Sequence, residues 1–160
     1  MTRQSRRTPR YFREGQAQAA AIPIDWDEYH RMLRPFQDAA KRVREGDPAG
    51  LPVAVDYLVR QPRFFGSGYL FEEMASALAV GADAGAFVSD IHEAILSVAR
   101  QPLRRETRYT ARLAARYWDE ALEAELRGIP TGAARRILAR APGIRDSYRG
   151  FGLVRGGRAD

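Results

Sequence analysis

Residues 83–102 read Asp-Ala-Gly-Ala-Phe-Val-Ser-Asp-Ile-His-Glu-Ala-Ile-Leu-Ser-Val-Ala-Arg-Gln-Pro. The apolar residues of this stretch recur at the three- and four-residue steps of an α-helix, and those expected to point inward are Phe87, Val88, Ile91, Ile95 and Val98. Asp83 stands before them as an expected N-cap, and Pro102 follows them as a stop. The stretch therefore predicts one amphipathic helix with defined ends.

The same pattern precedes this stretch three times. A helix is predicted from the N-cap Asp25 to Gly46, with one apolar stripe of Trp26, Tyr29, Leu33, Phe36, Ala40 and Val43. Pro35 is expected to kink or restart it near Arg34. A second helix follows Asp47-Pro48 and buries Leu51, Ala54, Val55 and Leu58. A third, capped by Ser67 and stopped at Gly81, buries Leu70, Phe71, Met74 and Leu78.

Three more helices are predicted after Pro102. The first has Tyr109, Leu113, Tyr117 and Trp118 as inward candidates, and the others cover residues 119–127 and 131–141. No segment alternates apolar and polar residues in the manner of a strand. The fold class expected is therefore all-α, a compact array of five to seven helices.

Positions spaced by 40 residues match one another. The matching sets are Ala54, Ala94 and Ala134; Leu58, Val98 and Leu138; Arg60, Arg100 and Arg140; and Pro62, Pro102 and Pro142. A period near 40 with a helix ending at each proline suits stacked helical hairpins of the HEAT or armadillo kind. An irregular helical bundle is the alternative arrangement.

The stretch 61–70, Gln-Pro-Arg-Phe-Phe-Gly-Ser-Gly-Tyr-Leu, carries a resemblance. It resembles a motif of uncharacterised bacterial helical proteins, HEAT-like and often actinobacterial, in which an aromatic pair and Ser-Gly-Tyr lead from a proline turn into a helix. The resemblance extends over about residues 48–127. It implies the helical fold and no activity.

Composition narrows the class of protein. The 160 residues include no cysteine, which excludes a disulfide scaffold, a thiolate metal site and a cysteine nucleophile. The first residues have no apolar stretch behind them, so no secretory signal is expected, and no apolar run approaches the ~20 residues of a membrane span. A cytoplasmic location is the expectation.

The net charge of +6 is concentrated at the two ends of the chain. Residues 1–24 hold five arginines and one glutamate, whereas residues 25–142 hold equal numbers of basic and acidic residues. We therefore expect a flexible basic arm at 1–24, a helical domain at 25–142 and an Arg/Gly-rich tail at 143–160. Arginines interleaved with glycine and aromatic residues resemble RGG-type segments that bind single-stranded nucleic acid.

Enzyme chemistry finds little support in the sequence. Asp27 and His30 match the Asp/Glu-x-x-His spacing of a helical metal site once, and no second copy exists; His30 and His92 are both expected on solvated helix faces. No nucleophile elbow, phosphate loop or dinucleotide fingerprint is present. We expect no enzyme, no catalytic residues, no metal and no cofactor.

Two surfaces are candidates for binding a partner. Gly66-Ser67-Gly68 at a helix start suits either an anion or, more often, a cap, with Phe64 or Phe65 packing back on Phe71. Arg104, Arg108 and Arg112 align as a basic ridge on the predicted fifth helix. The candidate partner-binding residues are Phe64, Phe65, Tyr69, Arg104, Arg108 and Arg112.

Two functions follow from these features. The first is a non-catalytic protein–protein interaction protein, such as an assembly subunit, an adaptor or an immunity-type inhibitor, with a neutral helical core and anchoring basic tails. The alternative is an RNA- or nucleoprotein-associated factor that binds phosphates through its tails. The tail residues proposed for nucleic acid are Arg3, Arg6, Arg7, Arg10, Arg13, Arg149, Phe151, Arg155 and Arg158.

Overall fold

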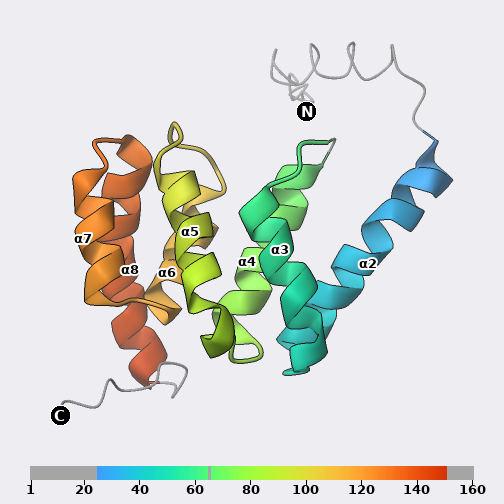
Figure 1. Ribbon diagram of the computed structural model, residues 1–160, viewed down its shortest axis with the longest axis horizontal. Helices are drawn as coiled ribbons and strands as arrows, with labels where there is room; N and C mark the ends of the chain where they lie inside the picture. The colour runs from blue at the N-terminus through green and yellow to red at the C-terminus, as the bar shows by residue number, and fades with distance from the viewer. Residues whose placement is uncertain (1–24, 65, 151–160) are drawn as a thin grey trace, which may run out of the picture. The chain divides into compact units, whose positions relative to one another are not determined.

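Amphipathic patterning of the kind found around residue 91 gives helices throughout the described chain. The structure is a computed structural model that describes residues 25–64 and 66–150. Its α-helices are α2 (Trp26–Arg44), α3 (Leu51–Arg60), α4 (Ser67–Val80), α5 (Val88–Ala99), α6 (Thr107–Arg116), α7 (Glu120–Gly128) and α8 (Gly132–Gly150). Short 3-10 turns, η1 (Pro48–Gly50) and η2 (Gly85–Phe87), precede α3 and α5. The described residues contain no strand, so the all-α prediction is confirmed for them (Figure 1).

The described chain divides into two units, and the boundary lies within α2 between Arg34 and Pro35. In the first unit, the Asp25 carboxylate accepts the backbone N–H groups of Asp27 and Glu28 at 3.0 and 3.1 Å and so begins α2 as predicted. The rings of Trp26, Tyr29 and His30 adjoin one another along this first part of the helix. Trp26 is 53% exposed, so its predicted place in an inward stripe is wrong.

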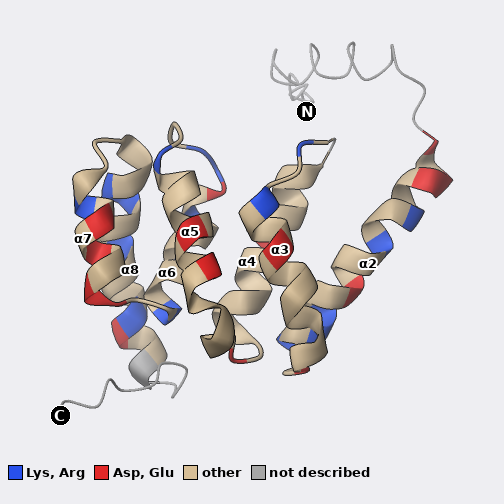
Figure 2. Ribbon diagram, in the orientation of Figure 1, with Lys and Arg blue, Asp and Glu red and all other residues tan. Residues whose placement is uncertain are grey.

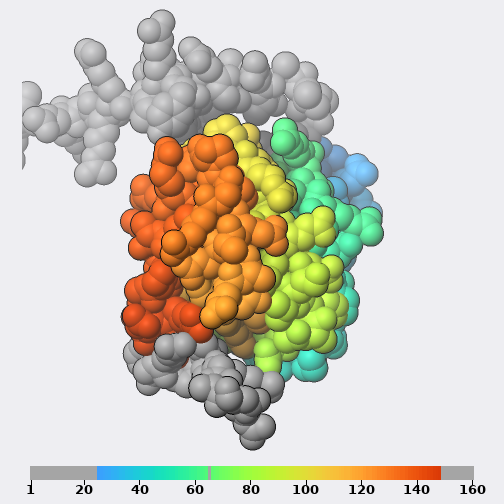
Figure 3. Space-filling model, turned by 60° about the vertical axis from the view of Figure 1, so that its left-hand side comes forward, coloured from blue at the N-terminus to red at the C-terminus, as the bar shows by residue number. Residues whose placement is uncertain are grey.

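In the second unit, helices that alternate along the chain lie side by side. The odd-numbered helices α3, α5 and α7 contact one another in order, and so do the even-numbered helices α4, α6 and α8. Consecutive helices also pair, as α3 with α4, α5 with α6 and α7 with α8 (Figure 1). The α7–α8 hairpin, orange to red in Figure 3, packs directly beside the helices that precede it. The result is two layers of three helices each.

The core between the layers matches the apolar faces read from the sequence. The most deeply buried large side chains include Leu58, Met74, Leu78, Ile91, Ile95 and Leu113, all of them predicted core residues. Asp47 caps the turn before α3 by accepting the Ala49 N–H at 2.9 Å, as its Asp-Pro pair predicted. Gly81 ends α4, again as predicted.

Side chains from α6 and the residue after it secure the end of α4. Arg116 donates to the carbonyl oxygens of Leu78 and Gly81 at 3.0 and 2.9 Å, satisfying acceptors that the helix leaves unpaired. The buried Tyr117 hydroxyl accepts the Ala84 N–H at 3.1 Å and donates to the Leu78 carbonyl oxygen at 3.3 Å. Burial raises the pKa of Tyr117, because the charged form would lose its solvation.

Several predicted helix boundaries differ from the structure. Asp83 is not the N-cap of α5, because the turn η2 intervenes and α5 begins at Val88 with Phe87 as its N-cap. Gly66, in a left-handed conformation, holds the N-cap position of α4, and Ser67 is the first helical residue without a side-chain capping bond. The helix expected at 131–141 continues to Gly150 through Pro142, so the first part of the predicted tail is helical. Pro35 does not restart α2, which runs through it. In each case a local stop or start signal yields to the surrounding packing.

The 40-residue period is only partly reproduced. Gln61 and Gln101, one period apart, occupy equivalent places after α3 and α5, and the Gln101 Nε2 group donates to Gln61 Oε1 at 3.1 Å. The third copy fails, because Arg140 and Pro142 lie inside α8, which belongs to the other layer. The period therefore describes two neighbouring hairpins.

Gly81 offers a direct test of this packing. A Cβ atom at Gly81 would lie 2.0 Å from the Val43 carbonyl oxygen, which also accepts the Ala82 N–H at 2.7 Å and so has little freedom to move. We expect Gly81→Ala to lower the free energy of unfolding by about 2 kcal/mol. Urea denaturation followed by circular dichroism measures this change.

The matched control is Gly128→Ala, at the end of α7, where a Cβ atom meets nothing within 4 Å. This variant is expected to be neutral or slightly stabilising, since alanine favours helix. Equal stability of the two variants would show that α4 does not end against Val43.

Candidate interaction surface

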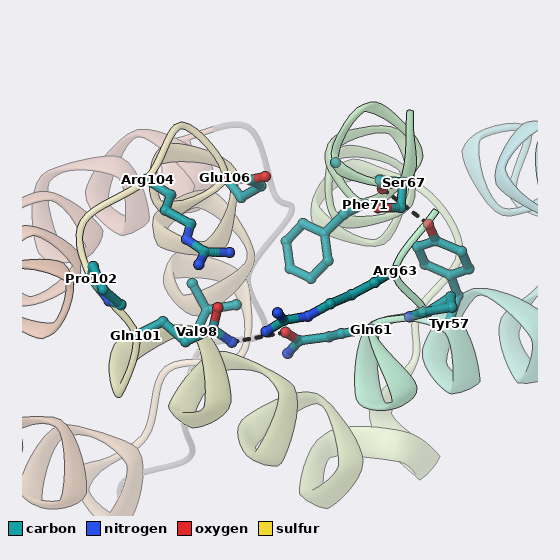
Figure 4. Close-up of a pocket in the computed structure, with 12 residues that line it drawn as sticks. Tyr57, Gln61, Arg63, Ser67, Phe71, Val98, Gln101, Pro102, Arg104 and Glu106 are labelled. Carbon is teal, nitrogen blue, oxygen red and sulfur yellow. Dashed lines mark hydrogen bonds between the residues drawn. The ribbon is translucent and has the colours of Figure 1, made fainter. Parts of the chain in front are cut away.

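The α3–α4 and α5–α6 connections meet at one end of the two-layer unit and enclose a pocket of about 90 Å³. Gln61 and Arg63 line it from the first connection, and Gln101 and Arg104 line it from the second (Figure 4). Phe71 of α4 supplies an apolar wall. The pocket thus joins two arginines and two amides to an apolar surface.

Local bonds hold the first connection in place. Gln61 ends α3 in a left-handed conformation, with a φ of 45°, and its N–H donates to the Tyr57 carbonyl oxygen. The Tyr57 hydroxyl donates to the Ser67 carbonyl oxygen at 3.0 Å, which ties α3 to the first turn of α4. Phe36 and Phe64 place their rings edge-on to Tyr57, with ring centres 5.1 and 6.5 Å away. These contacts hold the α3–α4 side of the pocket in place.

The helix start at Gly66-Ser67-Gly68 already has an anion beside it. A Cβ atom on Gly68 would lie 2.7 Å from the Glu106 carboxylate, so that carboxylate sits against the first turn of α4. A negative charge is favourable there because the helix dipole is positive at its N-terminus. The predicted Ser67 cap is therefore wrong, and the anion beside this motif is a carboxylate of the chain itself.

A buried ion pair lies next to the pocket. Glu72 of α4 is buried and its carboxylate pairs with the Arg105 guanidinium, whose side chain is about half exposed. The same guanidinium lies 4.1 Å from the centre of the exposed Tyr69 ring. The hydrogen bond with Tyr69 and the nearby Glu72 raise the pKa of Arg105, so it stays charged. Arg105 therefore stabilises the fold by neutralising the buried Glu72 carboxylate.

Arginines gather on α6 and α8. The described side chains of these two helices include seven arginines and one acid, Asp146; the arginines are Arg108, Arg112, Arg116, Arg135, Arg136, Arg140 and Arg145. On α3, α5 and α7 the proportion is reversed, with six acids and two arginines, as Figure 2 displays in red and blue. Residues 25–142 have no net charge, yet their positive and negative charges lie mostly on different helices.

Two tyrosines accompany the arginines on this surface. Arg108 and Arg112 place their guanidinium groups 4.6 and 5.7 Å from the centre of the Tyr109 ring, and Arg108 also donates to the Tyr109 hydroxyl. Burial raises the pKa of Tyr148 of α8, and the positive charge of the nearby Arg112 lowers it in part. We call Arg108, Tyr109, Arg112 and Tyr148 the arginine–tyrosine cluster.

The six predicted partner residues have different surroundings. Arg104 lines the pocket, Tyr69 lies beside the Arg105 guanidinium, and Arg108 and Arg112 belong to the arginine–tyrosine cluster. The single helical ridge is wrong, because α6 begins at Thr107, after Arg104. Phe64 is half-buried against Tyr57, and Phe65 lies outside the described residues.

Most of the predicted nucleic-acid residues fall outside the part of the chain that the structure describes. These are Arg3, Arg6, Arg7, Arg10, Arg13, Phe151, Arg155 and Arg158. Arg149 is in α8, but its side chain is not among those described. Sequence reasoning also missed Gln61, Arg63 and Gln101, although the 40-residue match already aligned the two glutamines.

The histidines differ in their surroundings. His30 is exposed, as expected. His92 is half-buried, and its Nε2 lies 2.7 Å from the Tyr117 carbonyl oxygen, which only accepts, so Nε2 carries the hydrogen. The expected solvated position of His92 is therefore wrong, and it joins α5 to the end of α6. The described residues hold no group of three or more potential metal ligands, and none of their helices has the length and apolar content of a membrane span.

Comparison with known proteins identifies no relative: no protein-family model, no curated protein and no solved structure matches this chain.

Adjacent arginines at the pocket should respond differently to substitution. Arg105→Gln leaves the Glu72 carboxylate buried without its partner, and we expect a loss of about 1–2 kcal/mol in the free energy of unfolding. Arg104→Gln, one residue earlier, removes the same charge from an exposed side chain without an ion pair and should change stability by less than about 0.5 kcal/mol. Urea denaturation of both variants makes the comparison, and equal losses would contradict the structural task of Arg105.

Proposed function

We propose that this chain is a non-catalytic interaction protein that binds an acidic protein partner through the arginine–tyrosine cluster and the neighbouring exposed arginines of α6 and α8. A HEAT-like stack of three hairpins, α3–α4, α5–α6 and α7–α8, is the arrangement we propose for its body. Contacts of odd helices with odd and even with even support that stack, and such stacks expose extended faces for partners.

The concentration of arginines on α6 and α8 carries the proposal. These two helices hold seven described arginine side chains and one acid, Asp146, so their exposed arginines repel one another in the isolated protein. An acidic partner removes this repulsion and gains charge-assisted hydrogen bonds to the guanidinium groups. On α3 and α7, by contrast, Arg60 and Arg127 pair within their own helices with Asp56 and Glu123. Arg108 and Arg112 form no ion pair with a described residue, and with the other arginines of α6 and α8 they make this surface the candidate for an acidic partner.

Capture from a lysate of the native host tests this proposal. The tagged full-length chain is compared with Arg108→Gln/Arg112→Gln and with the matched control Arg60→Gln/Arg127→Gln, which loses the same charge from the other layer. We expect a stoichiometric protein partner that resists nuclease and is retained at least tenfold less by the α6 variant. Rim charges of this kind act mainly on association and its salt dependence.

Two outcomes would contradict the proposal. Equal loss in the two double variants would mean that net charge alone drives capture. A captured partner that disappears with nuclease would instead favour nucleic acid. Circular dichroism of each variant confirms that the helices are intact before the comparison is made.

A nucleic-acid partner is the second candidate, and the arginine–tyrosine cluster is the observation that favours it. Guanidinium groups neutralise phosphates, and the accessible face of a tyrosine ring stacks on a base. Tyr109 is half-buried between two arginines, and Tyr148 is half-buried beside Arg112. These contacts support a nucleic-acid surface on the helical body in addition to the arginine-rich ends.

The salt dependence of binding to a single-stranded RNA separates body from ends. Removal of residues 1–24 and 151–160 leaves all of α8 in place. If the ends hold the phosphates, this removal abolishes binding. If the helical body holds them, the trimmed chain still binds, and Arg108→Gln/Arg112→Gln lowers the slope of log affinity against log salt by roughly 1–2. An unchanged slope in that variant would exclude the cluster as the RNA surface.

A further inference from the structure

We propose that the pocket between the α3–α4 and α5–α6 connections binds a carboxylate that has a short apolar stem. This inference does not depend on the proposed function, because the pocket is formed by residues outside the arginine–tyrosine cluster. It rests on three features of the lining: positive charge without a partner, a buried donor without an acceptor, and an apolar wall.

The positive charge comes from Arg63 and Arg104, one from each connection. Neither guanidinium forms an ion pair with a described residue, whereas the neighbouring Arg60 and Arg105 pair with Asp56 and Glu72. Glu106 is the one acidic residue in the lining, and its carboxylate lies against the N-terminus of α4 at Gly68. The pocket therefore has an excess of positive charge.

The buried donor is the side-chain amide of Gln61. Its Oε1 accepts from Gln101 Nε2 at 3.1 Å, and this bond orients the amide. Its Nε2 group is shielded from solvent and has no hydrogen-bond acceptor in the described structure. A buried donor left unpaired costs about 1–3 kcal/mol, and a turn of the Gln61 amide toward an acceptor in the pocket recovers this cost. Figure 4 shows the ends of Gln61, Arg63 and Gln101 close together, with Arg104 pointing into the same space.

The apolar wall and the size of the pocket limit the ligand. Phe71 and Val98 face the arginines, so the ligand has a carbon stem beside its charged group. A pocket of about 90 Å³ exceeds the space that a single water molecule needs, so it admits a small carboxylic acid or the carboxylate end of a longer group. A carboxylate is also planar and accepts parallel hydrogen bonds from a guanidinium fork. A fully hydrated ion such as phosphate uses the arginines and gains nothing from Phe71 and Val98.

Such a carboxylate has two sources, a free small acid or an acidic group on a peptide, and the test uses a probe for each. The full-length chain, labelled with nitrogen-15, is titrated with sodium propionate, with a blocked peptide carrying one glutamate and with a peptide that has a free C-terminus. We expect saturable shifts of the Gln61 and Gln101 side-chain amide signals, with propionate half-saturating in roughly the millimolar range. Tighter binding of a peptide than of propionate assigns the pocket to a partner's carboxylate, and the reverse order assigns it to a free acid.

A double substitution shows whether the pocket arginines hold the probe. Arg63→Gln/Arg104→Gln is expected to weaken propionate binding at least tenfold. The matched control Arg31→Gln/Arg34→Gln removes the same charge from exposed positions on α2 and should leave the affinity unchanged. The substituted side chains are exposed, so both variants should fold normally, and native amide spectra confirm this before the titration.

Several results would overturn the inference. One is the absence of saturable shifts at Gln61 and Gln101 with all three probes. Equal weakening in the two double variants would reduce the effect to non-specific charge. Phosphate binding as tightly as propionate would remove the role of the apolar wall. The capture experiment has a different readout and different variants, so failure here leaves the proposed interaction surface untouched, and the converse also holds.

Discussion

The filled inner surface of α6 determines how the rest of the second unit is arranged. Three helices, α4, α5 and α8, pack on this one helix, and its buried positions are mostly small: Thr107, Thr110, Ala111, Leu113, Ala114 and Ala115. Close-packed small side chains let neighbouring backbones approach, but they leave no room for a long charged group. The arginines of α6 are therefore restricted to its outer side or to carbonyl groups at helix ends.

This restriction links packing to charge. Arg116 is used inside the fold, where it satisfies two carbonyl groups at the end of α4, whereas Arg108 and Arg112 face solvent. The neighbouring α8 repeats the pattern, with Ala133, Ala134, Ile137 and Ala141 buried and Arg135, Arg136 and Arg140 exposed. Positive charge thus collects on two adjacent helices, and the field it creates favours an acidic partner over a neutral one.

The helices and their buried faces could be predicted from the sequence because they depend on local periodicity. Ile91, Ile95 and Leu58 are buried where the three- and four-residue steps place them. The end of α8 could not be predicted in this way. Pro142 is exposed within the helix, and the chain continues past it because α8 packs along α6 and α7. A stop signal read from two or three residues carries no information about such a neighbour.

The candidate sites were harder to predict from the sequence for the same reason. A count of charges along residues 25–142 gives a sum of zero, because the acids of α4, α5 and α7 offset the arginines of α6 and α8. Only the layering separates them in space. Arg104 was selected because its spacing to Arg108 suits a helix, but α6 begins only at Thr107. The connection before α6 nevertheless brings Arg104 into a pocket. Gln61 and Gln101 could have been found, since a 40-residue offset aligns them and neighbouring hairpins bring such positions together.

Amide hydrogen exchange of the captured complex, compared with the chain alone, tests the central claim most directly. A partner bound across the basic surface slows exchange by restricting local opening of the helices it covers. We expect added protection in α6 and α8, with little change in α3, α5 and α7. Protection confined to α3, α5 and α7, or to residues 1–24 and 151–160, would contradict it.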